Sequence, residues 1–487
     1  MKRIESSKDQ ISIESFGGTG GFITGSCHRV SIGKDFAILV DSGMYQGKFE
    51  ERSEKGERRN FTPMKNIAVG VTDVLETHIH IDHIGRLPKV YKDGFTPTIL
   101  ATELTTKFME TVLLNSAEIQ EEKNSQERLY DKWDVDKALR HIKAVKPFRK
   151  IDIGQKNSHL TAEFLPNGHV MGSSSIIVRE HSKNITILFT GDMGKPNQSL
   201  CGGYKEFIDE YPNDPINILM IESTNFERKP ISFEDKKNKF LESVYKTWEN
   251  GGNPLFPTLS FHRTPELIEL INNCQKSGEL PSDFKMIIDA PYAMELLDIT
   301  RKIGPKYLSR GYGDNPTFYK TDEESINRFD LKNLTIVGSH EQSVYMDREM
   351  AGYKGKAIII ASGGMGGFGR SENYIHGDFA KNPKNTILFN CFQVPGTEGS
   401  GLVKEEETVT RYKKTGARIS KLEGFTSHIS GPEETFEFLD RFNFKKLKKI
   451  IITHGKDSSR LAMAQEFKKR DFDTEIILSQ LNQLIPC

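Results

Sequence analysis

Short apolar runs and helical patterns alternate along this sequence, which is typical of an α/β protein. The apolar runs predict buried strands at Phe36–Val40, Val71–Glu76, Thr98–Ala101, Ile176–Val178, Ile185–Thr190, Ile218–Glu222, Ala357–Ser362 and Lys449–Thr453. The alternating run Ile11–Phe16 has the pattern of an edge strand. Apolar residues at helical spacing predict helices at Glu103–Glu122, Phe233–Trp248 and Pro265–Gly278. The charged run between Gln120 and Asp136 fits either a solvated loop or a helix end.

Several of these strands end on histidine or aspartate with a glycine nearby. The densest case is the run Thr77–Pro88, in which His78, His80, Asp82 and His83 fall within six residues. Asp41, His169 and Asp192 also follow apolar runs. Imidazole and carboxylate are ligands that suit zinc and neighbouring divalent metals, and a strand end places them at a sheet edge where loops converge. The pattern therefore predicts a metal site.

Composition narrows the class of protein. The chain has 487 residues, which favours two domains or one domain with a large insertion. Its 67 basic and 67 acidic residues cancel, so net charge gives no argument for nucleic-acid binding, although a local basic groove stays open. Five scattered cysteines without a CxxC pair fit a reducing cytoplasm. No apolar stretch has the length of a membrane span, and the glycine-rich Gly17–Gly21 lacks the GK[ST] of a P-loop.

The strand-end residues, taken in order, resemble the motifs of the metallo-β-lactamase-fold hydrolases. Asp41 resembles the first motif, the cluster from His78 to His83 the second, His169 the third and Asp192 the fourth. The resemblance implies an αββα sandwich with metal ions at one edge between the two sheets. In such a site Asp41 would orient a ligand or the bound water, although taken alone it also fits a turn cap.

Later segments resemble the β-CASP branch of these proteins, in particular the bacterial RNA-processing ribonucleases and the related nuclease subunit of the cleavage and polyadenylation specificity factor. Glu222 matches motif A, His428 motif B and His454 motif C. The loops Ser362–Met365 and Gln393–Thr397 match two further segments of the branch. The chain departs from the pattern where His262 replaces glycine, Pro265 replaces glutamine, Cys391-Phe392 replaces Gly-Tyr and Ser430 replaces aspartate.

The resemblance implies an α/β protein whose metallo-β-lactamase domain is interrupted by an inserted α/β β-CASP cap. We expect residues 1–225 to form the first part of the metallo-β-lactamase domain. Residues 226–414 would form the cap, and residues 415–487 would complete the first domain. Helical patterns dominate the sequence between 226 and 350, which agrees with this division.

The resemblance also implies two divalent metal ions, with zinc the first expectation and manganese or iron accepted by the same ligands. His78, His80 and His169 would hold one ion, Asp82, His83 and His454 the other, and Asp192 would bridge them. The expected catalytic residues are Asp41, Asp82, Glu222 and His428. Of these, His428 would give a proton to the leaving oxygen, with Glu222 beside it. The expected substrate contacts are Arg263, Ser362, Gly363 and Thr397.

The function implied is metal-dependent hydrolysis of RNA phosphodiester bonds by an activated hydroxide, in RNA processing or decay. His454 favours RNA, because DNA-processing relatives commonly carry valine at motif C, and the expected substrate is single-stranded RNA. The alternatives are a DNA-processing nuclease, a small-molecule hydrolase such as a thioesterase or lactonase, and a scaffold subunit, which would have lost ligands. The sequence does not distinguish endonuclease from 5′-exonuclease action. A homodimer is possible, but the sequence does not determine the oligomeric state. His141, His159, His181, His340 and His376 lack the strand-end format, and we assign them no site role.

Overall fold

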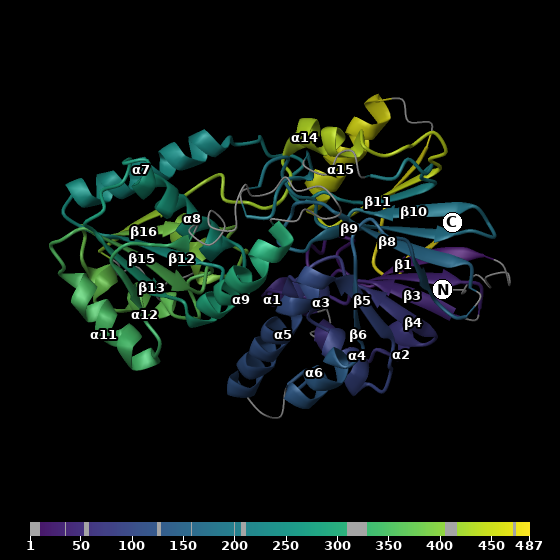
Figure 1. Ribbon diagram of the computed structural model, residues 1–487, viewed down its shortest axis with the longest axis horizontal. Coiled ribbons are helices and arrows are strands. Elements are labelled where there is room, and N and C mark those ends of the chain that lie inside the picture. Colours follow the sequence, from purple (N-terminus) through teal and green to yellow (C-terminus); the bar gives the residue numbers. More distant parts are fainter. Residues whose placement is uncertain are drawn as a thin grey trace. The chain divides into compact units, whose positions relative to one another are not determined.

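The structure is a computed structural model (Figure 1) that describes residues 10–34, 36–52, 58–123, 128–156, 158–198, 200–205, 211–308, 329–404, 416–470 and 474–487. The chain divides into two compact units, and each is described by itself. Among the described residues, the first unit runs to Lys229 and resumes at Ser427. The second unit runs from Pro230 to Thr426. The cap limits expected from the sequence, 226–414, remain a proposal.

The first unit contains two seven-stranded sheets. One has the strand order β20-β1-β2-β3-β4-β5-β6. Its strands are β1 (Ile11–Ser15), β2 (His28–Ile32), β3 (Phe36–Val40), β4 (Val71–Leu75), β5 (Thr98–Thr102), β6 (Ile142–Val145) and β20 (Leu484–Pro486). The other has the order β19-β18-β11-β10-β9-β8-β7. Its strands are β7 (Ile151–Ile153), β8 (Leu160–Pro166), β9 (Ser174–Glu180), β10 (Ile185–Phe189), β11 (Ile218–Glu222), β18 (Lys449–Thr453) and β19 (Glu475–Leu478).

The two sheets pack face to face around one apolar core. Val40 and Leu75 from the first sheet share this core with Phe164, Phe189 and Ile451 from the second, all buried. The strands are also apolar on their outer faces, because helices cover them. Figure 1 shows α5 and α6 beside the first sheet and α14 and α15 beside the second. The result is a four-layer αββα arrangement.

The helices of the first unit are short except for α5 and α15. They are α1 (Lys48–Glu51), η1 (Arg59–Phe61), α2 (Lys65–Ala68), α3 (Ile81–Ile84), α4 (Leu87–Lys92), α5 (Glu103–Lys123), α6 (Lys132–Leu139), α14 (Gly431–Leu439) and α15 (Asp457–Lys469). Asp131 caps α6 by accepting hydrogen bonds from the backbone of Trp133 and Asp134. None of the described helices is long and apolar enough to cross a membrane.

Strand direction explains why distant residues meet at one edge. β3, β4 and β5 are parallel, as are β10, β11 and β18. β8 is antiparallel to β9, and β9 is antiparallel to β10, so β8 runs the same way as β10. The carboxyl ends of β8, β10, β11 and β18 therefore lie along the same edge of their sheet, and the loops that follow them converge there.

The second unit is built on a six-stranded sheet whose neighbouring strands are all parallel, in the order β14-β13-β15-β12-β16-β17. Its strands are β12 (Pro254–Thr258), β13 (Lys285–Asp289), β14 (Leu334–Ile336), β15 (Ala357–Ser362), β16 (Thr386–Phe389) and β17 (Arg418–Lys421). Its helices are α7 (Phe233–Glu249), α8 (Arg263–Lys276), α9 (Pro291–Leu308), α11 (His340–Ala351), α12 (Ser371–His376), η4 (Phe379–Lys381) and α13 (Glu398–Lys404).

The elements agree with the hydrophobic pattern, with one correction. The run Ile11–Phe16 is not an edge strand, because β20 pairs with β1 on the side opposite to β2. The basic run Lys143–Lys150 has the composition of a solvated connection or an RNA contact, but its first residues belong to β6 at the sheet edge. Of the charged run Gln120–Asp136, the described parts belong mainly to α5 and α6, and residues 124–127 lie outside the described residues.

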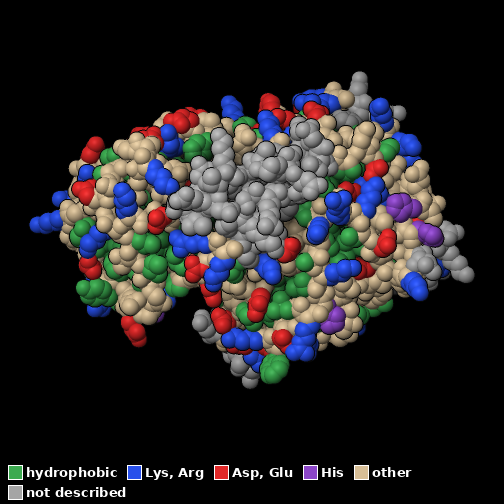
Figure 2. Space-filling view, viewed as in Figure 1, with side chains coloured by type: hydrophobic (Ala, Val, Ile, Leu, Met, Phe, Trp, Pro, Cys, Tyr) green, Lys and Arg blue, Asp and Glu red, His purple; other side chains and the backbone are tan. Residues whose placement is uncertain are grey.

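Lysine, arginine, aspartate and glutamate side chains are intermingled on the face shown in Figure 2. This surface agrees with the equal numbers of acidic and basic residues in the sequence. The charge of the whole chain therefore does not distinguish one functional surface, and a site has to be located from particular side chains.

Candidate metal centre

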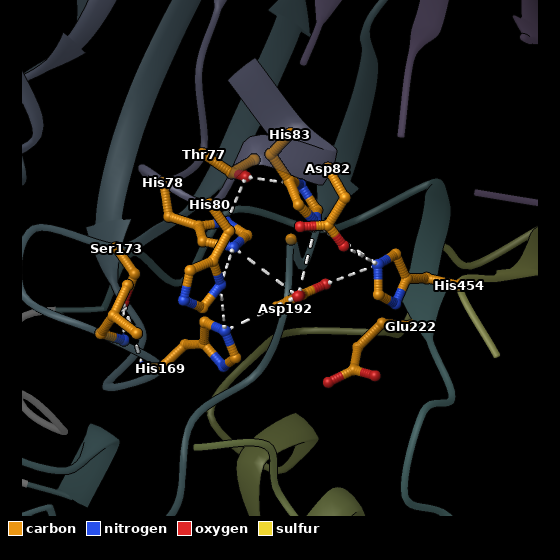
Figure 3. A network of polar contacts seen from close by, with 12 residues as sticks. Thr77, His78, His80, Asp82, His83, His169, Ser173, Asp192, Glu222 and His454 are labelled. Atoms are coloured by element: carbon orange, nitrogen blue, oxygen red, sulfur yellow. Dashed lines mark hydrogen bonds and ion pairs between the residues drawn. The ribbon is translucent and has the colours of Figure 1, made fainter. Parts of the chain in front are cut away.

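The structure brings all seven predicted metal ligands together in the first unit (Figure 3). They form two groups, and within each group one ligand atom per residue lies within 4.8 Å of the others. The first group is His78, His80, His169 and Asp192, and the second is Asp82, His83 and His454. These residues come from loops that follow β4, β8, β10 and β18.

Asp192 lies between the two groups. Its Oδ2 is 3.6 Å from Nε2 of both His78 and His169, and 3.4 Å from Nε2 of His83. Its Oδ1 is 3.5 Å from Nε2 of His454. One buried carboxylate therefore faces both groups, as a bridging ligand would.

A single helical turn after β4 directs the second motif. His80 has extended backbone angles and is the N-cap of α3, and the backbone N–H of His83 donates to its carbonyl at 2.9 Å. Asp82 and His83 therefore lie on a helical turn while His78 lies on the extended segment before it, and the rings of His78 and His83 still meet, with centroids 4.0 Å apart. Gly43 packs against this turn so closely that a Cβ there would lie 1.7 Å from the Asp82 carbonyl oxygen. Glycine is required at this position for steric reasons.

Asp41 and Thr77 hold the ligand rings from behind. Asp41 Oδ1 accepts a hydrogen bond from the Thr77 backbone N–H at 2.8 Å, and Oδ2 accepts from the Thr77 hydroxyl at 2.9 Å. His83 Nδ1 lies 2.7 Å from Asp41 Oδ2 and donates to it, which leaves Nε2 to face the other ligands. The single proton of the Thr77 hydroxyl is used in the hydrogen bond to Asp41, so the hydroxyl oxygen accepts from His78 Nδ1 at 3.0 Å. His78 Nε2 is thereby directed toward Asp192.

Thr224 holds His454 in a similar way. The Thr224 hydroxyl donates to the His454 carbonyl oxygen at 3.1 Å, and the hydroxyl oxygen of Thr224 lies 2.9 Å from His454 Nδ1. Because a hydroxyl has one proton, it accepts from Nδ1–H and leaves Nε2 toward Asp82 and Asp192. The backbone N–H of His454 donates to the carbonyl of Gly18 at 2.7 Å, which fixes the residue at a φ of 41°.

Asn167 joins the His169 loop to the Asp192 loop. Its amide donates to the carbonyls of Thr190 and Asp192 at 3.0 and 2.9 Å. The backbone N–H of His169 is bound by Ser173 Oγ at 3.0 Å. Two loops that follow different strands are therefore held at a constant separation.

The two groups differ in their protonation. Burial lowers the pKa of His78 and His169 well below the ordinary value, and lowers that of His80 to about 4. Burial would also lower the pKa of His454, but the Asp192 charge and the hydrogen bond to Asp82 outweigh it and raise the pKa to about 9. For His83 the charges of Asp192 and Asp41 likewise outweigh burial and raise the pKa well above its ordinary value.

The donor set fits divalent metal ions. His78 Nε2 is 3.0 Å from His80 Nδ1, and His169 Nε2 is 3.3 Å from the same atom, so three imidazole nitrogens meet at one place. His83 Nε2 and His454 Nε2 are 3.3 Å apart in the second group. Nitrogen lone pairs that converge beside carboxylates repel one another unless a cation or protons lie between them. The described residues can thus hold zinc or a related divalent ion.

Glu222 and His428 lie beside this centre. His428 Nδ1 is 2.9 Å from Glu222 Oε1, and its Nε2 is 3.7 Å from Asp192 Oδ2. Glu222 is buried and also accepts backbone hydrogen bonds from Met193 and Thr224 at 3.0 and 2.7 Å. A carboxylate fixed by these two backbone hydrogen bonds holds His428 with Nδ1 protonated and Nε2 directed toward the ligands.

The four predicted substrate contacts lie in the second unit and are not equally accessible. The Arg263 guanidinium is buried and paired with Glu266, which also binds Lys236 Nζ at 2.8 Å. The Thr397 hydroxyl donates to the Val394 carbonyl at 2.6 Å within its own turn. Ser362 ends β15, and Gly363 follows it with a φ of 105°. Their contact with substrate remains a proposal.

Sequence reasoning missed the residues that orient the ligands. Thr77, Asn167, Ser173 and Thr224 are ordinary loop residues by type, and only Thr77 stands beside a ligand motif. His28 was also missed, although it lines the same cavity as Asp41, His83 and His454. Burial, together with the nearby His83 and His454, lowers the pKa of His28 to about 3, so it is a neutral lining residue.

Comparison with known proteins matches both parts of the chain. Residues 20–219 match the family model described as metallo-beta-lactamase superfamily, and residues 264–402 match the Beta-Casp domain. These matches confirm the fold class predicted from the motifs.

Three similar proteins illustrate the range of relatives. Ribonuclease TTHA0252 of Thermus thermophilus is 25% identical over 469 residues, which cover 95% of this chain and 97% of the relative. Probable RNase MJ4 of Methanocaldococcus jannaschii is 25% identical, over 92% of this chain and 94% of the relative. Transcription termination factor FttA of Lokiarchaeum sp. is 26% identical, over 90% of this chain and 66% of that protein.

We predict that stabilisation by metal increases between pH 6.5 and pH 9. The raised pKa values of His454 and His83 mean that protonation of these rings stabilises the metal-free fold below pH 6.5, and the His454 contribution is lost as the pH rises through its pKa of about 9. The lowered pKa values of His78 and His80 in the first group change the stability of the metal-free fold only below pH 6.5. Thermal unfolding with chelator and with Zn²⁺ at several pH values measures the difference, and an equal difference at all pH values would contradict the assignment.

We predict that Thr224→Val lowers the affinity of the second ligand group for metal by about 10- to 100-fold, because the ring of His454 loses its hydrogen-bond partner. Competition with a chromogenic chelator measures this affinity. Thr224→Ser keeps the hydroxyl and is expected to behave like the unchanged protein. Equal metal affinity of the valine and serine variants would show that the hydroxyl does not orient His454.

Proposed function

We propose that this chain, which belongs to the β-CASP branch of the metallo-β-lactamase superfamily, is a metal-dependent ribonuclease that hydrolyses phosphodiester bonds in single-stranded RNA. The observation that carries the proposal is the pair of ligand groups that share Asp192, with the His428–Glu222 pair beside them. Relatives named as ribonucleases align over nearly their whole length, which supports RNA as the substrate. His454 at motif C supports the same choice over DNA.

The ligand groups suit two ions. His78, His80 and His169 would hold one ion, Asp82, His83 and His454 the other, and Asp192 would contact both. The ligands are all nitrogen and oxygen, which suits zinc, with manganese and iron as alternatives. When bound, two such ions neutralise charge on a phosphoryl group and activate water as the nucleophile.

The protein's own residues would position and protonate the reacting groups. Asp41 holds His83, and Thr224 holds His454, so both rings keep Nε2 toward the centre. Hydrolysis adds water across the P–O bond to the 3′ oxygen and leaves a 5′-phosphate and a 3′-hydroxyl. The leaving 3′ oxygen requires a proton, and His428 Nε2 would donate it while Glu222 keeps Nδ1–H in place.

A cytoplasmic location agrees with the sequence. The cysteines form no disulfide among the described residues, and Cys27, Cys201, Cys274 and Cys391 are buried. Buried thiols that form no disulfide are usual for proteins kept under reducing conditions.

We predict that Asp82→Ala abolishes RNA cleavage and removes metal from the second group, because that group loses its only carboxylate besides the shared Asp192. Labelled single-stranded RNA, chelator treatment and elemental analysis provide the measurements. His141→Ala is the control, since His141 binds the Lys137 carbonyl at an exposed position outside both groups. An Asp82→Ala protein with two metals per chain and full activity would overturn the proposed function.

We predict a different result for His428→Ala, which should keep both metals and lose about 10²- to 10⁴-fold in kcat, the usual contribution of a general acid. The loss should be smallest on an RNA analogue whose leaving oxygen is a weaker base, because such a group needs less protonation. Metal content measured on the same sample separates this role from ligation. A uniform loss on both substrates would assign His428 to structure instead.

A further inference from the structure

Three large apolar side chains are exposed on loops of the second unit. Leu259 is 39% exposed, Phe368 54% and Phe392 38%. Leu259 follows β12, Phe368 follows β15 and Phe392 follows β16. These strands are parallel neighbours in the sheet, so their carboxyl ends, and the loops that carry the three side chains, lie at the same edge.

The three loops are bound to one another. The carbonyl of Gly364 accepts hydrogen bonds from Gln393 Nε2 at 2.9 Å and from the Cys391 thiol at 3.2 Å. A Cβ on Gly364 would lie 3.2 Å from Leu259 Cδ2, so the first loop packs against the second. Exposed apolar side chains are therefore held on one fixed surface, and not on independent loops.

The topology of the sheet marks this edge as a ligand site. From β12 the chain moves to β13 and β14 on one side of the sheet, returns at β15 beside β12, and continues to β16 and β17 on the other side. β12 and β15 are thus the strands at which the winding direction reverses. In parallel α/β sheets, ligands bind outside the carboxyl ends of the strands at such a reversal.

The charges at this edge favour an anionic ligand. Two acids have cationic partners, because Glu266 binds Arg263 and Lys236, and Arg370 lies 3.7 Å from Asp289. A third, Glu398, has the His376 ring at 3.1 Å. Lys421, at the end of β17, is exposed and has no ion pair among the described residues. Lys421 pairs in register with Phe389, the last residue of β16, which places this cation at the same edge of the sheet.

We propose that Leu259, Phe368 and Phe392 form a surface on which bases of a single-stranded RNA stack, with Lys421 supplying positive charge beside it. An aromatic ring presents the same face to every base, so such a surface binds a strand without choosing a sequence. This inference rests on the proposed ribonuclease function and adds a place where the substrate's bases bind. If this surface bound a protein and not RNA, removal of the three apolar side chains would leave RNA affinity unchanged.

The test compares RNA affinity of surface variants in an Asp82→Ala background, in which cleavage is suppressed. Phe392→Ala and Phe368→Ala should each weaken binding of a fluorescein-labelled 12-residue single-stranded RNA by about 5- to 150-fold at fixed salt, the range for one lost stacking contact. Phe392→Trp should keep the affinity. The control is Tyr345→Ala, which removes an aromatic ring that is 64% exposed on α11 of the same unit.

A second arm uses RNA of the same length that lacks bases at its central positions. If the rings stack on bases, this strand binds the parent protein more weakly, and Phe392→Ala causes little further loss. An equal loss on both strands, or unchanged affinity in the alanine variants, would overturn the inference.

Cleavage by the metal-loaded parent chain separates this inference from the function beneath it. If the parent chain cleaves RNA and the phenylalanine variants bind as it does, only the stacking surface is rejected. If the parent chain neither binds nor cleaves RNA, the ribonuclease proposal fails and the surface fails with it.

Discussion

The site depends on one buried carboxylate, Asp192, which faces five imidazole rings. Nε2 atoms of His78, His83, His169, His428 and His454 lie between 3.4 and 3.7 Å from its oxygens. Burial would raise the pKa of Asp192, but the nearby His454, His83 and His428 outweigh it and hold the pKa well below its ordinary value. A permanent negative charge is therefore fixed where cations or protons must gather, and the surrounding nitrogens can approach one another because of it. Replacement of this residue would leave both ligand groups without their shared counter-charge.

The fold supplies this arrangement at a cost in backbone strain. Asp41 and His454 have φ values of 63° and 41°, a region that residues other than glycine rarely adopt. Such residues persist where the surroundings over-determine them, and they cluster at functional sites. Here Asp41 is held by Thr77 and His83, and His454 by Gly18 and Thr224. Strain and hydrogen bonding act on the same residues, which indicates that the rings are oriented before any ion binds.

The residues that the structure brings together in two groups could be found in the sequence, because strand ends and ligand types are both local patterns. Six consecutive residues contain His78, His80, Asp82 and His83, and each of the remaining candidate ligands follows an apolar strand. Pairings between distant segments were not legible. β1 became an internal strand because β20, more than 450 residues later, pairs with it. Thr224 could not be recognised either, because its role depends on two hydrogen bonds to a histidine 230 positions away. The ion pairs that Glu266 forms with both Arg263 and Lys236 could not be recognised from the sequence, because they exist only in the folded chain.

The departures from the β-CASP motifs have physical explanations of the same kind. His262 stands where the branch has glycine, and its φ of 63° is a value that glycine adopts without strain. Pro265 replaces glutamine at the third residue of α8, where the backbone N–H has no partner within the helix and a proline is tolerated. At Cys391-Phe392 the thiol binds the Gly364 carbonyl, and the neighbouring ring is exposed. With Arg263 neutralised by Glu266, this edge of the sheet offers aromatic surface more than free guanidinium charge. A strand bound here would therefore be held largely through its bases.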